Sequence, residues 1–221
     1  MKVFITAVSL QNTLHAALYE SDDPSLRSET KTPYPIFNLM RHAVSDESIP
    51  CDPDDEPAEY QMIAIKFPHA SSDRNLATLR QGLELFEKDH AVSIPLLVIE
   101  HGIDETSSEH IALFKALIDA IPQSCEIYAD ITYGTKPTPI ALFAALLYLQ
   151  TLRTYCKVAK IVYGQIETWS FDEASKSSMP AKANIYEVTP LLTIVALAES
   201  MARLGGENVE EAVRYLLSGV L

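Results

Sequence analysis

The residues with the most evident chemistry lie in one run, residues 130–139, which spells Asp-Ile-Thr-Tyr-Gly-Thr-Lys-Pro-Thr-Pro. Gly134 permits a positive φ angle, so its backbone N–H can approach a ligand closely. Lys136 supplies a positive charge. The hydroxyl groups that can bind phosphate or ribose belong to Thr132, Thr135 and Thr138. The run therefore predicts a phosphate site, although a capped helix entrance without any ligand would need the same residue types.

Two further sets of candidate residues follow apolar segments that are typical of strands. The first set is Ser9, Leu10, Gln11 and Asn12, and the second is His101 and Gly102. Ligands of open parallel sheets bind beyond the carboxyl ends of the strands, so both sets are candidates for the same site. The chain has no GxxxxGK phosphate loop and no GxGxxG after its first apolar segment, which disfavours an ordinary mononucleotide or dinucleotide site.

The elements that must position these residues alternate along the chain. Apolar segments rich in β-branched residues predict strands at 2–10, 60–67, 94–100, 125–131 and 158–163. Helices are predicted between them at 33–44, 73–89, 106–121 and 139–152, the last apolar on nearly all sides and therefore buried. This alternation indicates an α/β, Rossmann-like fold with a mainly parallel sheet and helices on both faces.

The C-terminal part has a different pattern. Residues 166–171 and 183–188 are expected to pair as a hairpin, and two helices are predicted at 190–204 and 207–217. We therefore divide the chain into a Rossmann-like core, residues 1–165, and a hairpin and helical extension of the same domain, residues 166–221.

Composition narrows the choice of partners. The 221 residues carry 30 acidic and 17 basic side chains, a net charge of −13 that repels long nucleic acids and anionic membranes. The three cysteines form no CxxC pair, and the acidic residues 52–56 are expected to be a solvated loop, so no metal site is predicted. The longest apolar run is about 14 residues, too short to span a membrane, and no signal peptide is visible. We expect a soluble, cytoplasmic protein.

The run at 130–139 also resembles a known signature. Asp130-Ile-Thr-Tyr-Gly134, followed by Lys136, Pro137 and a long apolar helix, is similar to the DxTHG signature of the CRISPR-associated CARF proteins. Gly102 after an upstream strand, Tyr163-Gly164 at the end of the next strand and the segment 184–192 agree in order, so the resemblance covers roughly residues 1–204. Tyr133 stands where the signature has histidine, so no imidazole role is carried over.

The resemblance implies a sensor domain. CARF domains form twofold dimers that bind cyclic oligoadenylates, the messengers of type III CRISPR antiviral signalling, and cyclic tetra-adenylate is the expected ligand. No cofactor is expected. The effector would be a separate protein or a C-terminal domain, because no Arg-x(4–6)-His motif of an effector ribonuclease is present. The residues implied to bind the ligand are Ser9, Leu10, Gln11, Asn12, His101, Gly102, Asp130, Thr132, Tyr133, Gly134, Thr135, Lys136, Pro137 and Thr138.

Two alternatives remain open. Some CARF domains cleave their ligand without metal, by attack of a ribose 2′-hydroxyl on the adjacent phosphodiester. In such a ring nuclease, Lys136 would stabilise the transition-state charge and Ser9 and Thr132 would orient the hydroxyl. His101 would be the candidate proton acceptor, because its ordinary pKa lies near neutrality. The other alternative is an unrelated α/β domain that binds or transforms a small molecule.

Overall fold

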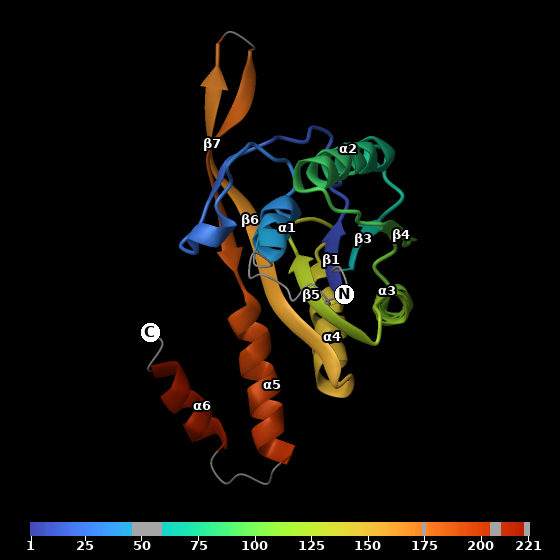
Figure 1. Cartoon of the computed structure of the whole chain (residues 1–221), viewed down its shortest axis with the longest axis vertical. Helices are drawn as coiled ribbons and strands as arrows, with labels where there is room; N and C mark the ends of the chain where they lie inside the picture. The colour runs from blue at the N-terminus through green and yellow to red at the C-terminus, as the bar shows by residue number, and fades with distance from the viewer. Residues whose placement is uncertain (46–58, 174–175, 204–208, 219–221) are drawn as a thin grey trace.

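A computed structural model describes residues 1–45, 59–173, 176–203 and 209–218 (Figure 1). The strands are β1 (Lys2–Ala7), β2 (Tyr19–Glu20), β3 (Tyr60–Lys66), β4 (Leu96–Glu100), β5 (Ser124–Asp130), β6 (Tyr155–Asp172) and β7 (Ser177–Glu187). The helices are α1 (Ile36–Ser45), α2 (Ser72–His90), α3 (Ser107–Ala120), α4 (Thr138–Leu152), α5 (Thr189–Arg203) and α6 (Val209–Ser218), with a short 3-10 helix, η1 (Pro24–Leu26). The predicted acidic loop at 52–56 lies outside the described residues.

The strands form one sheet in the order β2-β7-β6-β5-β1-β3-β4. β1 pairs in parallel with both β3 and β5, and the parallel pairing continues to β4 on one side and to β6 on the other. Only the β6–β7 pair is antiparallel among the described strands. Apart from β2, which lies at the far edge beside β7, the strands that follow β1 are added first on one side, as β3 and β4, and then on the other, as β5 and β6. This is the Rossmann strand order. The α/β prediction is confirmed.

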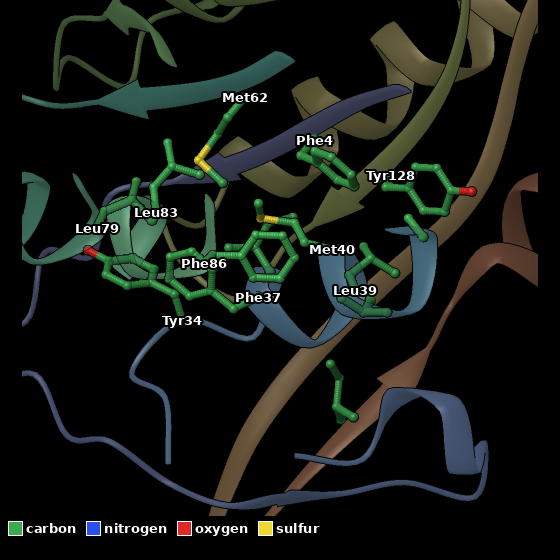
Figure 2. Close-up of a cluster of buried hydrophobic side chains, with 14 of the residues drawn as sticks. Phe4, Tyr34, Phe37, Leu39, Met40, Met62, Leu79, Leu83, Phe86 and Tyr128 are labelled. Atoms are coloured by element: carbon green, nitrogen blue, oxygen red, sulfur yellow. The ribbon is translucent and has the colours of Figure 1, made fainter. Parts of the chain in front are cut away.

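Helices cover both faces of the sheet because its central strands are apolar on both sides. In β1, Phe4 packs toward α1 and α2, whereas Val3 and Ile5 pack toward α3 and α4. Figure 2 shows the first of these layers, where Phe4, Met62 and Tyr128 of the sheet meet the side chains of α1 and α2. A strand that is buried on both faces needs continuous apolar sequence, which is the pattern that predicted β1, β3 and β5.

Two elements differ from the prediction. The strand predicted at 158–163 and the hairpin arm predicted at 166–171 are one continuous strand, β6, and its pairing with β7 carries the hairpin beyond the rest of the sheet (Figure 1). The first strand ends at Ala7 rather than at residue 10, because Ser9 already belongs to a loop that side chains hold in place.

Helix α4 is less buried than its sequence predicted. Its fifteen residues include no charged side chain, and Ala141, Leu142 and Leu146 are buried against the sheet. Yet Ile140 is 72% exposed and Leu152 is 59% exposed. The prediction of a helix buried on all sides is thus wrong for one apolar stripe along α4. Within the described residues, no helix is long and apolar enough to cross a membrane.

Candidate functional site

The candidate site lies where the strand order reverses. After β1 the chain runs first to β2, at the β7 edge of the sheet, and then through α1 to β3, whereas the loop after β5 leads to α4 and then to β6. Since β1 and β5 are parallel neighbours, with Ile5 beside Ala129, both loops emerge at the same edge, and the helices that follow them, α1 and α4, diverge to opposite faces of the sheet. Such a divergence leaves the crevice in which open α/β sheets bind ligands. The sheet thus brings the residues at 9–12 and at 132–138 to the same edge.

Asp130, the last residue of β5, holds the second of these loops in place through hydrogen bonds. Its side chain is buried, and one carboxylate oxygen accepts hydrogen bonds from the backbone N–H (2.9 Å) and the hydroxyl of Thr132. The other oxygen accepts a hydrogen bond from the hydroxyl of Thr6 in β1 at 3.2 Å. Burial raises the pKa of Asp130 from 3.8 to about 6, and these hydrogen bonds oppose the rise. Asp130 therefore fixes the loop and is not exposed to a ligand.

The turn at Gly134 gives the loop its shape. Gly134 has a φ of +111°, and a Cβ at that position would lie 2.8 Å from the Cβ of Thr138. The hydroxyl of Thr138 accepts the backbone N–H of Thr135 at 3.0 Å and so closes the turn before α4. Only glycine fits this conformation and this contact together.

The exposed side of the loop keeps its donors free. Lys136 is exposed, and its ammonium group has no ion pair or hydrogen bond with any described residue. The backbone N–H groups of Gly134 and Lys136 also lack a partner in the described part of the chain. A cation beside unengaged N–H groups at a helix entrance is suited to bind an anionic oxygen. Pro137 is half-buried at this entrance, where its ring presets the φ angle for the helix.

Tyr133 anchors the same loop to the segment before α1. Its hydroxyl donates to the carbonyl oxygen of Pro33 at 2.7 Å, and its ring lies edge-on to that of Tyr34 with centroids 5.4 Å apart. Burial raises the pKa of Tyr133 far above its ordinary value, so its phenol stays protonated. Tyr133 therefore offers a ring surface but no proton acceptor.

The loop after β1 is held in place by hydrogen bonds from buried side chains. Ser9 is fully buried, and its hydroxyl oxygen accepts the backbone N–H of Gln11 at 3.2 Å. The carboxamide of Asn75 in α2 donates to the carbonyl oxygens of Ser9 (2.7 Å) and Gln11 (2.9 Å). Leu10 is half-buried, whereas Gln11 and Asn12 are exposed. In this conformation Ser9 shapes the loop, and Gln11 and Asn12 are the members of the set that a ligand can reach.

His101 and Gly102 lie elsewhere. They follow β4, which is three strands away from β5 in the sheet, a separation of about 14 Å. Both line a separate pocket of about 260 Å³ that also contains Lys66 and Glu100. Burial lowers the pKa of His101, although Glu109 lies 3.8 Å from its ring. The structure therefore does not bring His101 or Gly102 to the loop of Lys136.

A pocket of about 240 Å³ opens beside that loop. Gln11, Thr132 and Tyr133, three of the predicted site residues, line it from the two loops. The rest of its lining is Tyr19 from β2 and residues 163–166 and Trp169 from β6. Trp169 is not among the site residues predicted from the sequence, because no local pattern indicates that β6 continues past the core. The only available signal was Tyr163-Gly164, which the resemblance had already singled out.

Thr132 links the loop, the pocket and β6. Its hydroxyl donates to Asp130 and accepts the backbone N–H of Gly164 at 2.8 Å. The fold and this geometry define the class: a Rossmann-like α/β protein with a polar crevice at the β1/β5 divergence. No protein-family model matches the chain, and no curated protein matches it. Among the described residues, no group of three or more His, Cys, Asp or Glu side chains is placed to hold a metal ion.

Proposed function

We propose that this protein is a sensor that binds a cyclic oligoadenylate, with cyclic tetra-adenylate as the expected ring, between the two subunits of a homodimer. The observation that carries the proposal is the position of the Asp130–Thr138 loop. Its signature-like residues lie at the divergence of β1 and β5, with the unpaired Lys136 on the exposed side. In this proposal the protein belongs to type III CRISPR antiviral signalling and passes its signal to an effector.

The free donors of the loop support a phosphate ligand. Lys136 and the N–H groups of Gly134 and Lys136 have no described partner that a phosphate would have to displace. These phosphate-binding groups belong to a chain of net charge −13, whose exterior disfavours long RNA. A small ring can still bind where two copies of this loop reverse the potential locally.

The apolar stripe of α4 supports the dimer. Ile140, Ala144, Tyr148 and Leu152 recur every four residues along one side of the helix, and all four are exposed. The stripe begins two residues after Thr138, so a second copy that covers it would bring two Lys136 loops to one twofold axis. A ring with twofold symmetry would then meet equivalent contacts from both subunits.

Disruption of this stripe is expected to yield monomers. We expect the unmodified chain to have twice the mass of one subunit in light scattering, and Ile140→Glu to have the mass of one, because a buried carboxylate without a partner opposes association. Leu85→Glu is the matched control, since Leu85 is 57% exposed on α2 at the other face of the sheet. A dimeric Ile140→Glu chain would argue against the proposed interface.

Binding of labelled cyclic adenylates tests the function directly. We expect cyclic tetra-adenylate to bind tightly, with cyclic hexa-adenylate and linear tetra-adenylate as comparisons, and a long single-stranded RNA to bind weakly at any salt concentration. Chromatography of the bound fraction separates the two roles: intact rings support a sensor, whereas linear products support the ring nuclease. Failure to bind any cyclic oligoadenylate would overturn both.

A further inference from the structure

The pocket beside the Lys136 loop differs from its surroundings in chemistry. None of its lining residues is charged, although the chain is strongly acidic. The residues that line it include the aromatic residues Tyr19, Tyr133, Tyr163 and Trp169, together with Gln11 and Gln165. Such a lining suits a neutral, flat, polar ring better than it suits a phosphate. By contrast, the larger pocket between β2 and β7 is lined by Glu20, Asp22, Arg27 and Lys182.

The polar groups of this pocket are available for recognition. The carboxamides of Gln11 and Gln165 make no hydrogen bond with any described residue. A carboxamide offers a donor and an acceptor side by side, which matches the paired acceptor and donor on an edge of adenine. Two free carboxamides at one pocket therefore point to a nucleobase.

Trp169 provides the stacking surface. It is the only tryptophan of the chain and is 48% exposed, and its one described ring contact is edge-on with His15, at 4.8 Å between centroids. It belongs to the paired part of β6, with Trp169 opposite Pro180 and Ser170 opposite Met179, directly after a register shift between Thr168 and Trp169. The hairpin thus holds an exposed indole at the pocket on a paired strand rather than on a loose loop.

We infer that this pocket is a nucleobase subsite in which Trp169 stacks on the base and Gln165, with Gln11, contacts its polar edge. The identity of the base as adenine rests on the proposed function. At about 240 Å³ the pocket holds one ring system rather than a whole nucleotide. Thr132 and Tyr133 belong to both the pocket and the loop, so a base here would have its phosphate near Lys136. The hairpin then selects the base, while the loop binds the phosphate.

The fluorescence of Trp169 reports directly on this subsite. Because no other tryptophan is present, we expect titration with adenosine 5′-monophosphate to quench the emission in a saturable way. Ribose 5-phosphate, which carries the same phosphate without a base, is expected to leave the emission unchanged. Uridine and guanosine monophosphates test whether the carboxamides prefer adenine. Absence of quenching by every base would contradict the subsite.

Substitutions separate stacking from folding. Trp169→Ala is expected to weaken the binding of adenosine monophosphate and of cyclic tetra-adenylate by tenfold or more, and Trp169→Phe is expected to restore most of it. Phe171→Ala is the matched control, since Phe171 is 66% exposed two residues further along β6 and does not line the pocket. Equal losses in the Trp169→Ala and Phe171→Ala chains would indicate damage to the hairpin and overturn the inference.

The two proposals can fail separately. If cyclic tetra-adenylate binds and Trp169→Ala does not weaken it, the base subsite is wrong and the proposed function stands. If the mononucleotide quenches Trp169 and no cyclic oligoadenylate binds, the subsite stands and the proposed ligand is wrong.

Discussion

Replacement of Lys136 with alanine is expected to weaken the binding of cyclic tetra-adenylate by more than tenfold. A charge-assisted hydrogen bond to phosphate contributes about 1.5–3 kcal/mol, and each subunit of a dimer would lose one. The substitution removes no stabilising interaction from the folded protein, because Lys136 is exposed and has no partner among the described residues. The melting temperature without ligand is therefore expected to stay the same, which separates a loss of binding from a loss of fold.

Two controls make the Lys136 experiment decisive. Lys136→Arg keeps the positive charge and is expected to retain most of the affinity. Lys88→Ala changes the net charge of the chain by the same amount as Lys136→Ala, but on the exposed side of α2, at the opposite face of the sheet from α4. Titration calorimetry at two salt concentrations measures all three. An affinity loss shared by Lys88→Ala would indicate a general charge effect, and an unchanged Lys136→Ala would show that the loop does not bind phosphate.

The part of the site that sequence could predict is the part fixed by local pattern. Runs of apolar residues defined β1 and β5, and polar residues directly after them had to emerge at the carboxyl edge of a parallel sheet. Gly134 and Thr138 predicted a tight turn into a helix, and the structure shows that turn. For these residues, the local sequence pattern is enough to predict where they lie in the fold.

The remainder depends on contacts between distant segments. The order of strands decides that His101 follows an edge strand, and no local pattern reveals that order. Likewise the loop at Ser9 is held by a hydrogen bond from Asn75, 66 residues away, and the place of Trp169 at the pocket depends on the length of β6. Residues chosen only because they follow a strand are therefore candidates for one edge of the sheet, not for one site.

Replacement of Asp130 with asparagine is expected to change how stability depends on pH. The pKa of Asp130 is about 6 in the folded protein and 3.8 as an ordinary carboxyl group. Between these values the folded chain binds more protons than the unfolded chain, so the free energy of unfolding falls as the pH rises from about 4 to about 6. The raised pKa amounts to about 3 kcal/mol of stability that the ionised, buried carboxylate removes above that range.

Asparagine keeps the shape of the side chain and cannot ionise. Its oxygen can still accept the backbone N–H of Thr132, and its NH₂ can donate to the hydroxyl of Thr6, which rotates to accept. The difference in unfolding free energy between Asp130→Asn and the unmodified chain is therefore expected to grow by about 2.5 kcal/mol from about pH 4 to about pH 7.5. Urea unfolding followed by circular dichroism at several pH values measures this difference, and other titrating groups largely cancel in it.

Asp130→Ala distinguishes the charge from the hydrogen bonds. Alanine also removes the carboxylate, but it leaves the backbone N–H of Thr132 without its acceptor, so it is expected to be less stable than Asp130→Asn at every pH by about 1–3 kcal/mol. Parallel pH curves for Asp130→Asn and the unmodified chain would show that Asp130 does not titrate in this range. Because the carboxylate lies beneath the loop of Lys136 and repels phosphate, Asp130→Asn is expected to bind cyclic tetra-adenylate no more weakly than the unmodified chain. The charge of this signature residue would then serve neither the fold nor the ligand, and only the hydrogen bonds of its side chain would be required.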